Sequence, residues 1–173
     1  MDAAHASITG RLDERFPGAV LERHDFRGDA TVVVPKERLL DLADFLFEEG
    51  FHLLVDLTAV DFLDRREGKR FDVVYHWLNL DNQERLRLKV QVDDGEAVPS
   101  LAVKFRTADW FEREVWDLFG IPFEGHPDLR RLLMWQDYQG HPLRKDFPLD
   151  GGDPFCTSDT GTSYAGHAKS LQG

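Results

Sequence analysis

The residues with the clearest chemical potential lie in the last third of the chain: Glu124, His126, Asp128, His141 and Asp146. Imidazole nitrogens and carboxylate oxygens can hold a divalent metal ion or transfer protons. No two of these side chains occupy positions i and i+4 of a predicted helix, and a proline directly follows each histidine. A metal or catalytic site is one interpretation. We favour the other, in which each histidine forms a hydrogen bond to the backbone of a fixed turn.

Basic side chains accompany both histidines: Arg130, Arg131, Arg144 and Lys145. A guanidinium group binds a carboxylate through two parallel hydrogen bonds, and arginine is enriched at protein interfaces. These residues could therefore form ion pairs across a subunit interface. They could equally pair within the chain, with Asp128, Asp137 or Asp146, or lie on a solvated face.

A third group of charged residues precedes this region, in a helix predicted over Ala108–Phe119. Glu112, Glu114 and Asp117 share this helix with Arg113. Two carboxylates could act as acid and base, but a solvated or arginine-paired helix face is more common, and we predict such a face. Gly120 is the predicted end of the helix, and Thr107 and Asp109 are its candidate N-caps.

The aromatic side chains near these charges divide into two groups. Those of the predicted helix, at Trp110, Phe111, Trp116 and Phe119, are expected in the core. Those of the irregular segment after it are expected as interface anchors, at Phe123, Trp135, Tyr138 and Phe147.

The elements that must position these residues follow from the hydrophobic pattern. Helices are predicted over Ala3–Phe16 and Pro35–Glu49, the second ending at Gly50. Leu53, Val55 and Leu57 are expected on one face of a strand. The predicted strands are Ala19–Phe26 and Thr31–Val34, joined by a turn at Arg27-Gly28-Asp29, and then Phe51–Phe62, Phe71–Leu80 and Arg85–Val92. Val98–Val103 is predicted as a short strand or a connector.

This order of elements predicts an α+β fold: a two-layer sandwich with helices on one face of a mixed, mainly antiparallel sheet. No hydrophobic period persists after Ile121, so an extended irregular segment is expected to follow the sandwich. We predict a core domain over residues 1–120, an extended interface segment over 121–149 and a flexible or partner-ordered tail over 150–173.

Composition excludes several classes of protein. The single cysteine, Cys156, cannot supply the ligands of an iron–sulfur cluster or a cysteine-rich zinc site, and it suggests a reducing compartment. Net charge −11 disfavours binding to nucleic acid or to anionic lipid. The sequence has no glycine-rich phosphate loop, no secretory signal and no apolar run of about 20 residues. We therefore expect no cofactor in this chain.

Three blocks of sequence, taken together, resemble a known family. They are Glu112-Arg113-Glu114 with Asp117-Leu118-Phe119-Gly120-Ile121, then the run from Gly125 to Leu133, then the run from Gly140 to Leu149. They are similar to the signature of the C subunit of NADH-quinone oxidoreductase, the 30 kDa subunit family of respiratory complex I. The order of the upstream elements is also similar, so the resemblance covers most of residues 1–149.

The resemblance implies a non-catalytic subunit of the peripheral arm, which scaffolds the quinone module while electrons pass from NADH to a quinone. The partners that it implies are subunits D, B and I, of which the first is the large one and the other two carry clusters. FMN, the iron–sulfur clusters and the quinone site would all belong to other subunits. The location would be the cytoplasmic side of the bacterial inner membrane, held there only through the complex.

Two alternatives to this implied role stay open. An equivalent subunit of a related membrane-bound hydrogenase, or of another quinone-reducing dehydrogenase, is the nearer one. A small metal-dependent enzyme is more distant.

In this family the signature residues would act as contact residues, with no catalytic, cofactor or metal role. They are Glu112, Arg113, Glu114, Asp117, Phe119, Gly120, Gly125, His126, Pro127, Arg130, Arg131, Gly140, His141, Pro142, Arg144, Lys145, Phe147 and Pro148.

Overall fold

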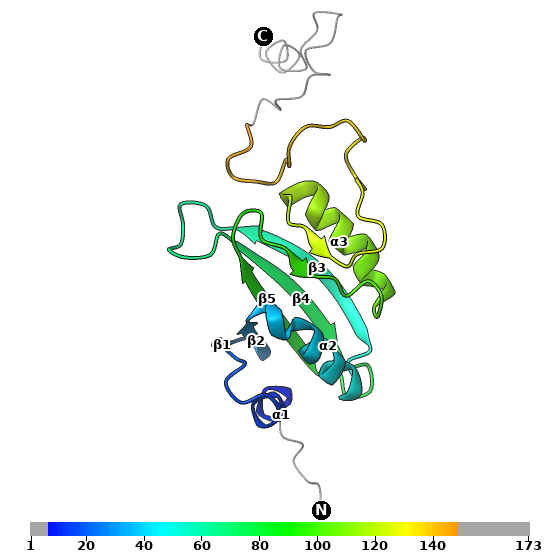
Figure 1. Ribbon diagram of the computed structural model, residues 1–173. Coiled ribbons are helices and arrows are strands. Elements are labelled where there is room, and N and C mark those ends of the chain that lie inside the picture. Colours follow the sequence, from blue (N-terminus) through cyan, green and yellow to red (C-terminus); the bar gives the residue numbers. More distant parts are fainter. Residues whose placement is uncertain (1–6, 149–173) are drawn as a thin grey trace, which may run out of the picture.

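Five strands form a mixed sheet in the computed structural model, which describes residues 7–148 (Figure 1). The strand order is β1-β2-β5-β4-β3, and only the β2–β5 pair is parallel. This confirms the predicted mixed, mainly antiparallel sheet. The strands are β1 (Glu22–Phe26), β2 (Asp29–Val34), β3 (Leu53–Asp61), β4 (Phe71–Leu78) and β5 (Arg85–Val92).

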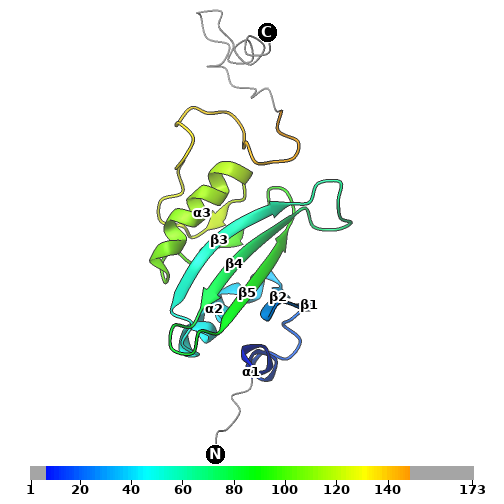
Figure 2. The same cartoon turned by 180° about the vertical axis from the view of Figure 1, so that it is seen from behind.

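Helices α2 and α3 cover one face of this sheet, as predicted. They lie in front of it in Figure 1 and behind it in Figure 2, where the strands face the viewer. The helices are α1 (Ile8–Arg15), α2 (Leu39–Glu48), preceded by the 3₁₀ turn η1 (Lys36–Arg38), and α3 (Arg106–Phe119). Residues 1–6, in which the first predicted helix begins, and the predicted tail at 150–173 lie outside the described residues.

The core lies between the helices and the sheet, and strict alternation along β5 shows how the sequence builds it. Leu86, Leu88, Val90 and Val92 are fully buried, while the residues between them are partly exposed. In β4, Trp77 and Tyr75 stand opposite Leu86 and Leu88 and point to the same side. An antiparallel sheet with one packed face and one open face has this period-two pattern.

The prediction for β3 was wrong in one respect. The pairing register of β3 shifts between Leu54 and Asp56, so an extra residue is inserted there. Such a bulge moves the following side chains to the other face. As a result Leu54 and Leu57 are buried, while Val55, expected on the same face as Leu57, is 48% exposed.

Of the two ends of α3, only the N-terminal end differs from the prediction. The N-cap is Phe105, which makes no side-chain capping bond, and the Thr107 hydroxyl donates instead to the carbonyl of Leu54. Neither Thr107 nor Asp109 is the cap. At the C-terminus, Gly120 adopts a left-handed conformation with φ +77°, which confirms the predicted end.

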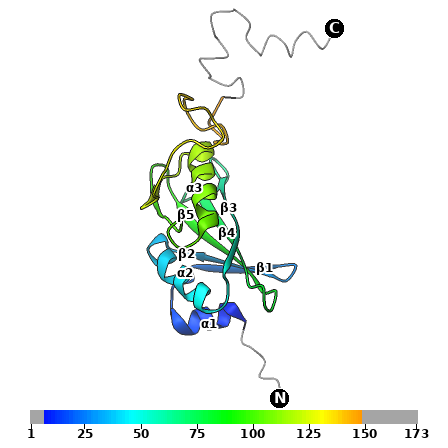
Figure 3. The ribbon, with the colours of Figure 1, turned by 90° about the vertical axis from the view of Figure 1, so that its right-hand side faces the viewer.

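Residues 121–148 follow α3 as a largely irregular segment that we call the strap. It begins with a two-residue strand, β7 (Phe123–Glu124), paired in parallel with β6 (Val98–Pro99). The strap lies at the end of the molecule opposite α1, as Figures 1 and 3 show. Within residues 7–148, no helix is long and apolar enough to cross a membrane.

Candidate functional site

The strap supplies the capping groups of α3. The last four carbonyls of an α-helix have no partner within the helix. In α3 the carbonyl of Trp116 accepts from the Gly120 N–H, and the other three accept from the strap. The Asp117 carbonyl accepts from His141 Nδ1 (2.9 Å), that of Leu118 from the Leu143 N–H (3.0 Å), and that of Phe119 from Arg144 (3.3 Å).

Asp117 is the centre of this attachment. Its side chain is fully buried, and one carboxylate oxygen accepts from the backbone N–H groups of Leu132, Leu133 and Met134 at 2.7 to 2.9 Å. The other oxygen accepts from Arg131 at 2.7 Å. Burial alone would raise the pKa of Asp117, but the Met134 N–H, the Arg131 guanidinium and the other two N–H donors outweigh it and lower the pKa. Asp117 therefore stays ionised and fixes a turn of the strap.

Two arginines hold the same part of the strap through backbone carbonyls. Arg113 of α3 donates to the carbonyls of Arg130 and Arg131. Arg131 in turn donates to the carbonyls of Tyr138 (2.7 Å) and Gly140 (3.1 Å), in addition to Asp117. The side chain of Arg131 thus pairs within the chain, and so does that of Arg113.

Both histidines bind the backbone of α3, as the structural interpretation predicted. The ring of His126 is buried; its Nδ1 accepts from the Asp128 N–H, so Nε2 carries the proton and donates to the Asp109 carbonyl at 3.1 Å. His141 donates to the Asp117 carbonyl. These two carbonyls are eight residues apart, about 12 Å along the helix at 1.5 Å per residue.

This separation keeps the two histidines from sharing one ion. No group of three or more histidine, cysteine or acidic side chains suited to a metal ion occurs in residues 7–148. The structure does not bring the five candidate ligands together.

An ionic network attaches the far end of the strap to the sheet. Arg144 pairs with Asp94 and Asp146, and Arg70 binds the carboxylates of both Asp61 and Asp146. The backbone N–H of Lys145 donates to Asp61 at 2.9 Å. Among the three arginines Arg130, Arg131 and Arg144, only Arg130 has a mostly exposed side chain in its ion pair, with 71% exposure beside Asp128. Lys145 is exposed as well.

Of the two predicted alternatives for the charged face of α3, the solvated one is wrong, because Glu112 as well as Asp117 is fully buried. The arginine-paired one holds for Asp117, which binds Arg131. Glu112 accepts from the Ser100 hydroxyl (2.5 Å) and the Leu101 N–H (2.7 Å), and so fixes the turn that leads into α3. Burial raises the pKa of Glu112 to about 7, against the opposing effect of these two hydrogen bonds.

A signal for these roles was present in the sequence. Ala108, Glu112, Val115 and Phe119 follow one helical stripe with spacings of four, three and four residues, which places Glu112 among core positions. A second stripe, from Asp109 through Arg113 to Asp117, faces the strap. Neither stripe is uniformly apolar, so hydrophobic periodicity alone misses both.

Apolar side chains remain exposed on and beside the strap. They are Trp110 (59% exposed), Leu133 (56%), Leu143 (51%) and Trp135 (43%). Trp110 was expected in the core, and this expectation was wrong. Two expected interface anchors, Phe123 and Tyr138, are instead buried within the chain. Pro142, Leu143 and Phe147 line a hollow of about 540 Å³ on the strap.

Gly120→Ala is expected to destabilise the protein more than a matched glycine change. A Cβ at Gly120 would lie 2.5 Å from Cδ2 of His141, so the ring would have to leave its hydrogen bond. Gly18 has nearly the same φ, +78°, with nothing within 4 Å. We expect Gly120→Ala to lower the free energy of unfolding at least about 1 kcal/mol more than Gly18→Ala, measured by urea denaturation. Equal losses would show that His141 does not pack on α3.

Comparison with known proteins identifies the family. Residues 32–153 match the family model described as respiratory-chain NADH dehydrogenase, 30 Kd subunit. The C subunit of NADH-quinone oxidoreductase from Geobacter sulfurreducens is 46% identical over 145 residues, which are 83% of this chain and 89% of the relative. The same subunit from Roseiflexus sp. is 43% identical over 165 residues, 93% of this chain and 94% of the relative.

Two solved structures share the fold. One is a trypsin-resistant fragment (1–134) of Nqo5, with TM-score 0.63 and 32% identity, covering 70% of this chain and 98% of that one. The other is a chain of the membrane-bound sulfane sulfur reductase, an archaeal respiratory membrane complex, with TM-score 0.70 and 28% identity, covering 82% and 84%. The chain belongs to the 30 kDa subunit family of the respiratory-chain NADH dehydrogenase, as the C subunit of an NADH-quinone oxidoreductase.

Proposed function

We propose that this subunit is a non-catalytic scaffold of the peripheral arm, and that the strap is its docking surface for the quinone module. The observation that carries the proposal is that the strap has two sets of side chains and backbone groups, one bound to the rest of the chain and one exposed. Its inward groups bind the helix carbonyls and Asp117, while Leu133, Trp135 and Leu143 stay exposed. Exposed apolar and aromatic side chains on an already fixed backbone suit binding with little loss of conformational entropy.

The partners we propose are subunits D, B and I of the quinone module, and the strap is the segment that would contact them. We further propose that FMN, the iron–sulfur clusters and the quinone site belong to other subunits, since a single cysteine cannot ligate a cluster. The protein would then lie at the cytoplasmic side of the inner membrane, through the complex. Three of the signature residues would act on this interface indirectly, because Arg131, His126 and Asp117 shape the strap from inside the chain.

Leu133→Ser with Leu143→Ser is expected to block assembly and leave the isolated chain nearly as stable as before. Both side chains are more than half exposed, so their loss removes little core packing. Native gels of the membrane fraction should show at least a tenfold loss of the assembled complex, with a melting temperature of the isolated chain within about 3 °C of wild type.

The matched control is Leu40→Ser with Leu80→Ser, at positions 49% and 65% exposed and far from the strap in sequence. Normal assembly of the Leu133 and Leu143 variant, or an equal loss in the control, would contradict a docking role for the strap. Arg130→Ala, which removes an exposed guanidinium, is expected to weaken assembly in the same assay. Arg144→Ala tests it less cleanly, because it also breaks the pair with Asp94.

A second candidate is the equivalent role in a related respiratory complex. The similarity to a chain of the archaeal sulfane sulfur reductase complex favours it, because the same fold occurs in that assembly. Purification of the intact complex from native membranes, with mass spectrometry of its subunits, separates the two candidates. Subunits with a flavin and NADH site support complex I.

A further inference from the structure

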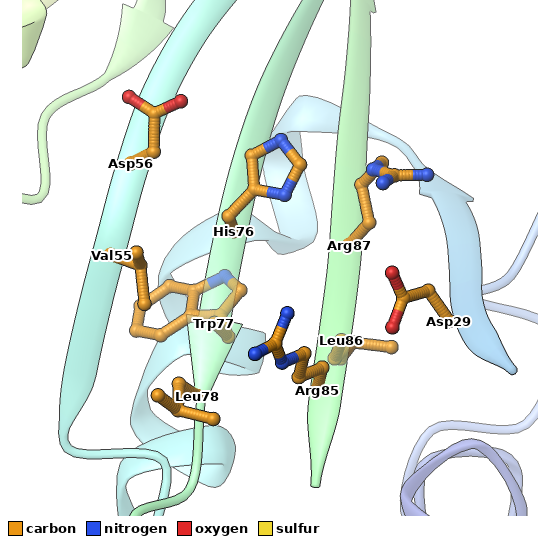
Figure 4. Close-up of a pocket in the computed structure, with 9 residues that line it drawn as sticks. All are labelled: Asp29, Val55, Asp56, His76, Trp77, Leu78, Arg85, Leu86 and Arg87. Atoms are coloured by element: carbon orange, nitrogen blue, oxygen red, sulfur yellow. The ribbon is translucent and has the colours of Figure 1, made fainter. Parts of the chain in front are cut away.

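The sheet has a hollow on the face that the helices leave uncovered. Its volume is about 290 Å³, and strands β2 to β5 form its floor. Figure 4 shows His76 at its centre, with Asp56 on the β3 side and the two arginines of β5, Arg85 and Arg87, on the other side. This face is opposite the one covered by α2 and α3 (Figure 2).

Charged groups of this hollow are separated across the sheet by the strand register. Asp56 stands opposite His76, and His76 stands opposite Arg87. One row of side chains thus runs from a carboxylate on β3 to a guanidinium group on β5. Neighbouring strands lie about 4.8 Å apart, which places Asp56 and Arg87 about 10 Å apart at the backbone. Asp56 and Arg87 therefore do not form an ion pair with each other.

The two arginines lack a carboxylate partner. Within residues 7–148, Arg85 has no ion pair or side-chain hydrogen bond, and Arg87 donates only to the Thr31 hydroxyl at 3.3 Å. By contrast Asp72, on the same face, is bound by both Arg66 and Lys89. Asp29 and Asp56 also line the hollow, but neither forms an ion pair with Arg85 or Arg87. A pair of guanidinium groups without an ion pair is thus a particular property of this end of the open face.

His76 adds no positive charge to the site at neutral pH. Burial, and next the charge of Arg87, lower its pKa, while the charges of Asp56 and Asp29 oppose this shift. The cationic groups are then Arg85 and Arg87 alone. Their backbones are two residues apart on one strand, about 7 Å, so one carboxylate can enter between them.

Apolar side chains flank the arginines. The β3 bulge exposes Val55, and Leu78 lies half-buried opposite Arg85. Arginine is enriched at protein interfaces, where apolar side chains are also covered. A free small anion would leave these apolar walls in water, whereas a protein segment would cover them.

We propose that this hollow, lined by Arg85, Arg87, His76 and Val55, binds an acidic segment of another subunit of the complex. An aspartate or glutamate of that segment pairs with Arg85 and Arg87, and an adjacent apolar side chain packs on Val55 and Leu78. This interface is separate from the strap, on the open face of the sheet. The subunit would therefore join two partner surfaces.

A photo-crosslinking amino acid at Val55 tests this in the complex purified from native membranes. Val55 is exposed, so the substitution leaves the core intact. We expect a crosslink to another subunit, in a peptide that carries Asp or Glu close to the crosslinked residue. Arg85→Glu with Arg87→Glu should lower its yield at least tenfold, the effect of about 1.4 kcal/mol. Arg15→Glu with Arg65→Glu, which changes the net charge equally at other exposed positions, should leave the yield unchanged.

Four results would overturn the proposal: no crosslink to another subunit, a crosslink only to the chain's own residues, a crosslink only to a second copy, or an unchanged yield after reversal of both arginines. Strap variants are not used in this test. Its failure is thus distinguishable from failure of the proposed docking of the strap.

Discussion

Asp117→Ala is expected to lower the free energy of unfolding by about 3–5 kcal/mol, the range for removing one partner of a buried ion pair. The loss has a specific origin. The substitution leaves three backbone N–H groups without an acceptor and Arg131 without its carboxylate partner, in a site where the carboxylate itself is fully buried. Urea denaturation of the isolated chain, followed by tryptophan fluorescence, measures the change.

Glu114→Ala is the matched control for this variant. Glu114 lies one turn earlier on α3, is partly exposed, and forms no hydrogen bond or ion pair within residues 7–148. Its replacement should change the free energy of unfolding by less than about 0.5 kcal/mol. If Asp117→Ala were as mild as this control, Asp117 would not be the attachment point of the strap.

Glu112→Gln is expected to change how stability depends on pH. The folded-state pKa of Glu112 is about 7, raised from 4.5 by burial, so folding favours the protonated form. Well below pH 4.5 the Glu112 carboxyl is protonated in both the folded and the unfolded state, so it does not reduce the free energy of unfolding. As the pH rises toward 7 the unfolded chain ionises first, and the wild type loses about 1.4 kcal/mol per pH unit from this group, about 3 kcal/mol by pH 8.

Glutamine has the same shape and no charge, so the variant escapes this loss. The difference in free energy of unfolding, variant minus wild type, should increase by about 2–3 kcal/mol between pH 5 and pH 8. Taking the difference cancels the other titrating groups, such as Asp61 and Asp117, whose pKa values are lowered. Glu114→Gln should give a flat difference over the same range. A flat difference for Glu112→Gln as well would mean that Glu112 is ionised in the folded protein.

The sequence predicted the fold where a period was regular. The alternation of Leu86, Leu88, Val90 and Val92 defined β5, and Gly120 ended α3 as expected. The register of β3 could not be predicted, because a bulge of one residue at Val55 leaves no mark in the hydrophobic pattern.

The site was predicted in part. The histidines were rightly assigned to backbone hydrogen bonds, since the prolines behind them restrict the chain. The carboxylates of α3 were predicted on a solvated or arginine-paired face, because charged residues are rarely buried without a partner. Arginine pairing holds for Asp117, but the burial of Glu112 and Asp117 was not predicted. Their partners include backbone N–H groups of a segment without hydrophobic periodicity, which for Asp117 are those of Leu132 to Met134. No local sequence pattern predicts such long-range contacts.

The central claim is that residues of the chain itself fix the strap before it meets a partner. Amide hydrogen exchange of the isolated chain tests this most directly, at Leu132, Leu133 and Met134, whose N–H groups bind Asp117. We predict slow exchange of these amides in the free wild-type chain and fast exchange in Asp117→Ala. Exchange at the rate of an unstructured chain in the free wild type, with protection only in the assembled complex, would contradict the account.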